Sequence, residues 1–169
     1  MNTILTLIVL LALPPMLVSI APLPAAKVGK PAPDFVLNDL NSEAAIKLSD
    51  YNGKVVLLDF WASWCAPCKH SLPKLSELKE SVPNLEIVTI TIDDKAQNAE
   101  RFIERLKLDL PAGFDVKKEV AEAYGVSAMP SAFLIDQSGT LDKVYSGYTV
   151  RDFNKIVFDA HELSSSGTN

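Results

Sequence analysis

Two strand-like runs limit what this chain can fold into. Lys54 to Phe60 reads K-V-V-L-L-D-F, and Leu85 to Ile92 reads L-E-I-V-T-I-T-I. The first run is almost continuously apolar, which is typical of a strand buried on both faces, and the second run is a further candidate for a central strand. Each run is followed by a stretch with helical periodicity, and alternating strands and helices favour a parallel arrangement of strands. The two runs therefore predict the centre of a partly parallel sheet that is covered on both faces.

The other elements follow from periodicity and turn residues. A helix is expected to begin at or just after Cys65, because Leu72, Leu75 and Leu78 share one face of it, and Pro73 should kink it. A late hairpin makes the sheet mixed, so the pattern predicts an α/β sandwich. The remaining expected elements are short strands at Phe35–Leu37 and Ile46–Leu48, a helix capped by Asp93-Asp94, a helix over Val116–Tyr124, hairpin strands Ser131–Ile135 and Leu141–Ser146, and a last helix from the Thr149-x-x-Asp152 capping box to about Glu162.

The first 26 residues carry no charged side chain. Ile4–Leu13 is apolar except for Thr6 and has the length of the apolar part of a signal peptide, about 7–15 residues. Ile4–Leu23 could instead form a membrane anchor of about 20 residues, and the absence of a preceding Lys or Arg slightly favours this alternative. Either alternative exports the chain to the periplasm or cell envelope, where disulfides form. We expect a signal peptide or membrane anchor over residues 1–26, one folded domain over 27–163, and a polar tail over 164–169.

Composition excludes several classes of function. The net charge is −5 and no block of Lys or Arg occurs, so no nucleic-acid partner is expected. The chain has two cysteines and two histidines, and a zinc site needs about four ligands. His161 is remote in sequence from the cysteines, so we predict no metal and no cofactor other than the cysteine pair itself. A purely structural disulfide is disfavoured, since a Cys-x-x-Cys loop is too short to constrain much chain.

The cysteines lie three positions apart, directly after the first apolar run. Cys65 and Cys68 would open a helix, whose N-terminal partial positive charge stabilises a thiolate, the form that attacks disulfides. Cys65 is expected to attack a client disulfide and Cys68, one turn on and more buried, to resolve the mixed disulfide. Pro67 suits the first turn because it lacks an N–H. Trp61 and Trp64 can shield the disulfide and offer clients an apolar contact.

This region resembles a known superfamily. The stretch Asp59–Lys69 is similar to the active-site region of thioredoxin, Pro73 matches the kink of its active-site helix, and Gly147 matches its late glycine. Met129-Pro130 is similar to the cis-proline loop that faces the cysteines. The lead-in Val28–Leu37 resembles that of exported TlpA/ResA-like thiol–disulfide oxidoreductases. The resemblance implies a thioredoxin-like three-layer sandwich, with a mixed central sheet and helices on both faces.

The resemblance also implies roles for individual residues. Asp59 corresponds to the buried acid that exchanges a proton with the second cysteine, and burial should raise the pKa of its carboxyl. Several ResA-like proteins place a Glu three residues after the second cysteine, where this chain has Ser71. The lysine that accompanies the acid in thioredoxin is also missing, and Thr89 aligns best with it. Client specificity would lie in the surface around Trp64, Ala66 and Met129.

The most favoured function is reduction of protein disulfides, with electrons from a membrane thiol donor and clients such as those of cytochrome c maturation or metal-site assembly. We expect a monomer. Ala66-Pro67 between the cysteines is closer to thioredoxin's Gly-Pro than to DsbA's Pro-His, which favours reduction over the alternative, an oxidant of folding proteins. A copper metallochaperone on the same fold is a further alternative. Such a protein typically has Cys-x-x-x-Cys spacing and a distal His, whereas this chain has two residues between its cysteines. A peroxidase is disfavoured, because peroxiredoxins place a Thr three residues before the reactive Cys and this chain has Ala62 at that position.

Overall fold

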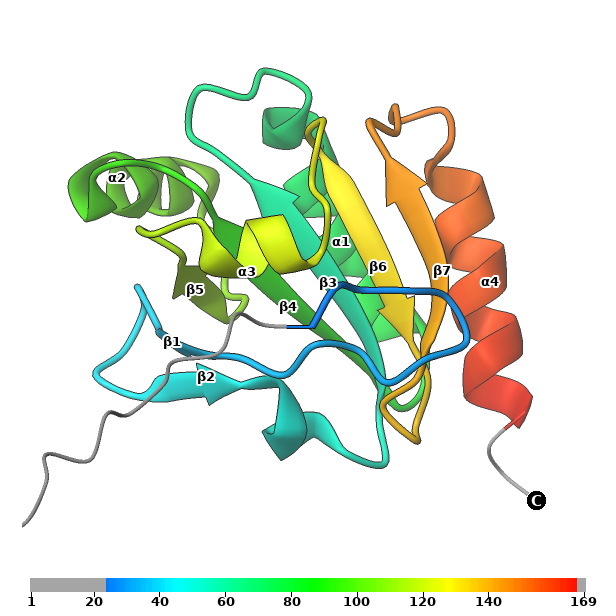
Figure 1. Cartoon of the computed structure of the whole chain (residues 1–169). Helices are drawn as coiled ribbons and strands as arrows, with labels where there is room; N and C mark the ends of the chain where they lie inside the picture. The colour runs from blue at the N-terminus through cyan, green and yellow to red at the C-terminus, as the bar shows by residue number, and fades with distance from the viewer. Residues whose placement is uncertain (1–23, 167–169) are drawn as a thin grey trace, which may run out of the picture.

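A five-stranded mixed sheet forms the middle of the structure, a computed structural model that describes residues 24–166 (Figure 1). The strand order is β5-β4-β3-β6-β7. Strands β3, β4 and β5 run parallel, and β6 and β7 are antiparallel to their neighbours. The α/β class and the mixed central sheet with helices on both faces are thus confirmed. The strands are β3 (Val55–Trp61), β4 (Leu85–Thr91), β5 (Ala112–Phe114), β6 (Ser131–Ile135) and β7 (Leu141–Ser146).

The first apolar run is the central strand β3, and all seven of its residues are buried. It pairs with the second run, β4, in a register that extends from Val55 opposite Leu85 to Trp61 opposite Thr91. On its other side β3 pairs with β6, where Asp59 lies opposite Ala132. A strand that has neighbours on both edges and layers on both faces must be apolar almost throughout, as the sequence predicted.

Alternation along β3 sends its side chains into two separate cores. Val55, Leu57 and Trp61 face a core that also contains residues of the helices α1 (Cys68–Ser81), α2 (Ala96–Leu106) and α4 (Phe153–Ser166). The residues between them face a second core, under the short helix α3 (Glu119–Ala123) and the N-terminal hairpin. That hairpin consists of β1 (Val36–Asn38) and β2 (Ala45–Lys47) and is followed by the 3-10 helix η1 (Leu48–Tyr51). In Figure 1 the hairpin and α3 lie in front of the sheet, and α1 lies behind it.

Several boundaries differ from the prediction. Helix α1 begins at Cys68, so Cys65 precedes the helix. Strand β5 was not predicted, because its three residues, A-G-F, are too few to show alternation. Helix α4 continues to Ser166, about one turn beyond the expected end at Glu162, and Ser164 is buried. The reciprocal hydrogen bonds of the predicted capping box form, since Asp152 Oδ2 accepts the Thr149 backbone N–H at 3.0 Å and Thr149 Oγ1 accepts the Asp152 N–H at 3.4 Å, but α4 begins only at Phe153.

The expected signal peptide or membrane anchor, residues 1–26, lies almost entirely outside the described residues. Among residues 24–166, none of the helices combines the length and the apolar character that a membrane span requires.

The edge strand β5 is covered by the chain that follows β1. Ala112 donates its backbone N–H to Asp39 Oδ1 at 3.0 Å, and its carbonyl accepts the N–H of Leu40 at 2.9 Å. At Gly113 the two segments approach so closely that a Cβ would lie 2.9 Å from Leu37 Cδ1 and 3.2 Å from Leu37 Cβ. This contact leaves no room for a side chain at position 113.

We therefore expect Gly113→Ala to destabilise the protein by about 1–3 kcal/mol, because the added methyl group overpacks the site. In a Leu37→Ala background most of the clashing side chain is gone, so the same substitution should cost clearly less. Urea unfolding of the four proteins of this double-mutant cycle measures the coupling between the two positions. Equal costs of Gly113→Ala in both backgrounds would contradict the packing argument.

Candidate active site

Cys65 and Cys68 form a disulfide where β3 leads into α1, with their Cα atoms 5.3 Å apart. The Cys68 backbone N–H donates to Cys65 Sγ at 3.3 Å, so the first turn of the helix presents a donor to this sulfur. Pro67 precedes the helix with φ −62°, the value its ring imposes and the helix needs. Cys65 is 5% exposed and Cys68 is fully buried, so only Cys65 is accessible to a client.

The loop between β3 and the cysteines is held by the buried carboxylate of Asp93. Asp93 Oδ2 accepts the Ser63 backbone N–H and the Thr91 hydroxyl, each at 2.8 Å, and Oδ1 accepts the Ser63 hydroxyl at 2.7 Å. The prediction that Asp93-Asp94 caps the next helix was wrong. The residue before α2 is Lys95, and Asp93 joins the end of β4 to the active-site loop instead. Its three hydrogen bonds fix the approach to Cys65.

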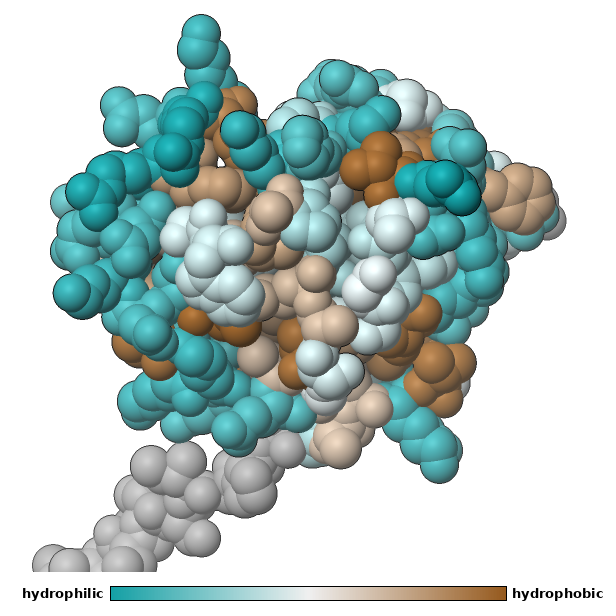
Figure 2. Space-filling view, turned by 90° about the horizontal axis from the view of Figure 1, so that it is seen from above, coloured by the Kyte–Doolittle hydropathy of each residue, from teal (hydrophilic) through white to brown (hydrophobic). Residues whose placement is uncertain are grey.

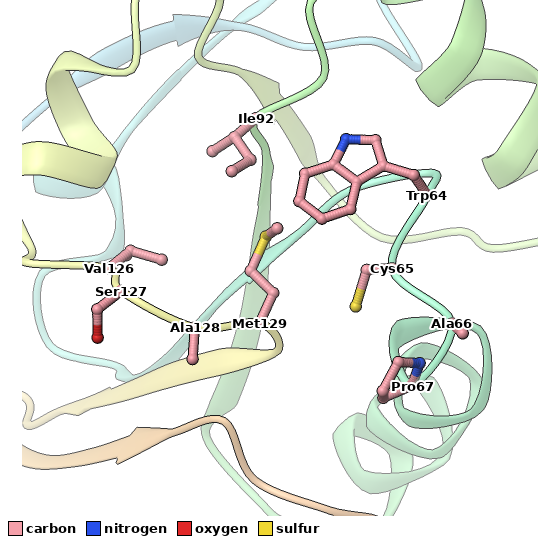
Figure 3. Close-up of a pocket in the computed structure, with 9 residues that line it drawn as sticks. All are labelled: Trp64, Cys65, Ala66, Pro67, Ile92, Val126, Ser127, Ala128 and Met129. Atoms are coloured by element: carbon pink, nitrogen blue, oxygen red, sulfur yellow. The ribbon is translucent and has the colours of Figure 1, made fainter.

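An apolar pocket of about 480 Å³ opens beside Cys65 (Figure 3). Cys65 and Met129 lie on opposite sides of this pocket, and the indole of Trp64 lies above the space between them in this view. Ile92 and Val126 line the end away from the cysteine. Seen from above, the face that carries the active-site loop is pale to brown in its middle and mostly hydrophilic at its rim (Figure 2). The pocket can therefore accept an apolar segment of a client next to its disulfide.

The structure brings only part of the expected surround to this pocket. Trp64, Ala66, Pro67 and Met129 line it, and Trp64 is 67% exposed. Trp61 instead lies in the core and stacks on Phe102, with ring centroids 5.3 Å apart. Pro130 is buried behind Met129, and the Met129–Pro130 peptide bond is cis.

Asp59 lies two residues before the end of β3 and is fully buried. Burial raises the pKa of its carboxyl to about 8, although a hydrogen bond from Tyr148 lowers it in part. The Tyr148 hydroxyl donates to Asp59 Oδ1 at 2.9 Å. Thr89 lies opposite Asp59 in the sheet register, but its hydroxyl donates to the carbonyl of Pro111 at 2.9 Å. The partner of the buried acid is therefore a tyrosine, in place of thioredoxin's lysine.

Sequence reasoning missed Tyr148. The available signal was its position directly after Gly147, which was matched to thioredoxin's late glycine. That match placed the segment near the site, but nothing in the sequence indicates that the next side chain turns inward to a carboxyl on β3.

Among residues 24–166, no group of three or more His, Cys, Asp or Glu side chains is placed to hold a metal ion. The reactive group that the described residues provide is the disulfide itself.

The arrangement as a whole defines a class of protein. A Cys-x-x-Cys disulfide at the start of a helix, an apolar pocket at the accessible sulfur and a buried carboxyl on the preceding strand together make a thioredoxin-like thiol–disulfide oxidoreductase site. Residues 28–144 match the model of the AhpC/TSA family. The chain belongs to this family and, within it, to the ResA-like thiol–disulfide oxidoreductases.

Individual relatives support this assignment. The chain is 38% identical over 130 residues to thiol-disulfide oxidoreductase ResA of Geobacillus thermodenitrificans, covering 76% of this chain and 74% of the relative. It is 36% identical over 121 residues to ResA of Bacillus subtilis, with 70% and 67% covered. Among solved structures, a Chlorobium tepidum protein assigned as thiol:disulfide interchange protein DsbE superposes with a TM-score of 0.73 at 33% identity, covering 81% of this chain and 99% of that one.

The raised pKa of Asp59 has a consequence for stability. The folded oxidised protein keeps the Asp59 proton up to about pH 8, whereas the unfolded chain releases it near its ordinary pKa of 3.8. Stability is therefore lost as pH rises between these values, by up to about 1.4 kcal/mol per pH unit. We expect Asp59→Asn to remove this loss, so that the variant becomes increasingly more stable than the parent from pH 4 to 8, with a constant difference above pH 8.

Urea unfolding of the oxidised proteins from pH 4 to 9 measures this difference. Asp159→Asn is a matched control whose parent carboxyl has its pKa shifted in the opposite direction. Burial alone would raise the pKa of Asp159, but hydrogen bonds from Lys143 and Tyr145 lower it overall, so its contribution to stability is complete above its ordinary pKa and the cost of Asp159→Asn should be nearly constant from pH 4 to 9. A pH-independent effect of Asp59→Asn would show that Asp59 ionises normally.

Proposed function

We propose that this protein reduces protein disulfides in the periplasm or cell envelope. Cys65 attacks the client disulfide and Cys68 resolves the mixed disulfide, which leaves the client as a dithiol and this protein oxidised. The observation that carries the proposal is the asymmetry of the pair. Cys65 lines an apolar pocket, whereas Cys68 is fully buried against the core.

The surroundings of Cys65 support the reducing direction. A strongly oxidising pair owes its potential to stabilisation of its reduced, thiolate form. Within the described residues, Cys65 Sγ accepts one hydrogen bond, from the Cys68 backbone N–H. The two residues between the cysteines are Ala66 and Pro67, which carry neither a charge nor a side-chain donor. With so little to stabilise the thiolate, the dithiol gives up its electrons readily.

The proposal includes a partner that regenerates the dithiol. A membrane protein with a thiol pair would supply the electrons, and the apolar N-terminal stretch would bring this chain to the same membrane. Clients with paired cysteines, such as those of cytochrome c maturation or metal-site assembly, fit the pocket's apolar lining. The folded domain would act as a monomer.

The reduction potential tests the direction of the reaction. We expect the Cys65–Cys68 pair of the full-length protein, equilibrated with glutathione or dithiothreitol, to have a potential near or below about −220 mV. Pro67→His should raise it by about 30 mV or more, because an imidazolium beside Cys65 stabilises the thiolate, and Pro67→Ala is the matched control without a charge. A parent value above about −150 mV would make the protein an oxidant of folding proteins.

Two further measurements separate the alternatives. Copper titration of the reduced protein tests a metallochaperone, and peroxide consumption tests a peroxidase. A peroxidase is disfavoured because Ala62, three residues before Cys65, is buried and has no side-chain donor.

The location has its own test. Fractionation of cells that express the chain with a C-terminal tag should place it in the envelope or periplasm. Its mass distinguishes the two forms of the N-terminus, since a cleaved signal peptide would remove about 26 residues and a retained anchor would leave the chain in the membrane fraction. Recovery of full-length protein in the cytosol would overturn the envelope assignment.

A further inference from the structure

Tyr148 lies in the loop between β7 and α4, far from the cysteines in sequence, yet its side chain is buried in the core that also contains Cys65 and Cys68. Its hydroxyl donates to Asp59 Oδ1 at 2.9 Å. Asp59 Oδ2, which is equally buried, has no hydrogen-bond partner among the described residues. The carboxyl is thus held through one oxygen while the other is left unpaired.

The unpaired oxygen belongs to a side chain on the cysteine face of the sheet. Because side chains alternate along β3, Asp59 points to the same face as Leu57 and Trp61, and these two residues share a core with Cys65 and Cys68. Beside Asp59 in the sheet lie Thr89 and Ala132, neither of which titrates.

Within residues 24–166, no basic side chain competes for the Asp59 carboxyl. The titratable residues of this core are Cys65, Cys68, Tyr145 and Tyr148, and α4 contributes the apolar Phe153 and Ile156. Among the described residues, no Lys, Arg or His affects the pKa of Asp59.

Tyr148 also connects this carboxyl to the first turn of α1. The buried Ser71 hydroxyl is a second hydrogen-bonding neighbour of Tyr148, and Ser71 donates to the Cys68 carbonyl at 3.4 Å. Burial raises the pKa of the Tyr148 hydroxyl far above its ordinary value, so this group remains a donor throughout the range in which thiols titrate. A donor that never ionises is suited to fixing a carboxylate while the carboxylate gains and loses a proton.

We propose that Tyr148 is a positioning residue for thiol–disulfide exchange: its hydroxyl holds Asp59 through Oδ1 and leaves Oδ2 as the oxygen that takes the proton from Cys68. In the resolving step the Cys68 S–H bond breaks and its proton passes to Oδ2. The Cys68–Cys65 disulfide forms, the bond from Cys65 to the client sulfur breaks, and the client thiolate leaves and is protonated by solvent. The client disulfide has then gained the two electrons that the dithiol has lost. This inference rests on the proposed reducing direction.

The hydrogen bond from Tyr148 favours the charged form of Asp59. Without this hydrogen bond, Asp59 should ionise only at higher pH. The attack of Cys68 on the mixed disulfide needs the ionised carboxylate, so it should also require higher pH. We expect Tyr148→Phe to raise the apparent pKa of Asp59 by about one unit, and to raise by the same amount the pH at which the mixed disulfide is resolved at half its maximal rate. At pH 7 this shift corresponds to an about tenfold slower resolution of the mixed disulfide. Well above both pKa values the two proteins should resolve the mixed disulfide at similar rates.

The test uses the full-length protein and two readouts. Reduced protein is mixed with a disulfide-linked peptide, and the mixed disulfide is followed by acid quench and mass spectrometry from pH 5 to 10. The titration of Asp59 in the oxidised protein is followed by the carboxyl ¹³C shift. Tyr145→Phe is the matched control, because the Tyr145 hydroxyl also donates to a buried carboxylate, Asp159 Oδ2 at 2.6 Å, but on α4.

Each outcome has one meaning. A displaced pH profile and Asp59 titration in Tyr148→Phe, with neither change in Tyr145→Phe, supports the proposal. Unchanged profiles in Tyr148→Phe, equal displacement in both variants, or a loss of rate that persists at every pH overturns it. If the parent protein fails to reduce the peptide at any pH, the proposed function fails first, and the ¹³C titration alone still decides whether Tyr148 controls Asp59.

Discussion

The complete burial of β3 is the constraint on which the rest of the structure depends. This strand has neighbours on both edges and packed layers on both faces, so its apolar residues are removed from water and provide much of the stabilisation of both cores. The same burial surrounds the one carboxyl in the strand with a medium that resists charge. Stability and acid–base chemistry therefore have a common origin: the environment that holds the sheet together is the one that keeps Asp59 protonated to about pH 8.

Sheet topology then gathers the site at one edge. The parallel strands β3 and β4 both end there, β6 begins there and β7 ends there, because β6 and β7 alternate in direction. The loops at this edge supply Cys65, Asp93, Met129 and Tyr148 from four separate parts of the sequence. In Figure 1 this edge is the upper end of the sheet, where α1 begins. The mixed sheet thus brings the accessible cysteine, the carboxylate that holds its loop, a pocket-lining side chain and a buried hydroxyl donor to the same edge.

The sequence predicted the central strands, the α/β class and the cysteine pair, because continuous apolar runs and Cys-x-x-Cys spacing are local patterns. It failed where a contact joins distant segments. Asp93 was expected to cap a helix, because Asp is a common residue at that position. Its carboxylate instead accepts hydrogen bonds from the backbone N–H and the hydroxyl of Ser63, which is 30 residues away in the sequence. Tyr148 has no local pattern that marks it as a partner of Asp59, and the hydrogen bond between them joins positions 89 apart in the sequence. Strand β5 is held by long-range contacts, namely its pairing with β4 and its hydrogen bonds with Asp39 and Leu40.

The position of Cys68 has a kinetic consequence for the proposed mechanism. Cys68 is fully buried and adjacent to Cys65, so its attack on a mixed disulfide at Cys65 would be an intramolecular step. The rate of such a step does not depend on the concentration of clients. The time spent on each client would then be set by the interior around Cys68, and client concentration would change only how soon the next mixed disulfide forms.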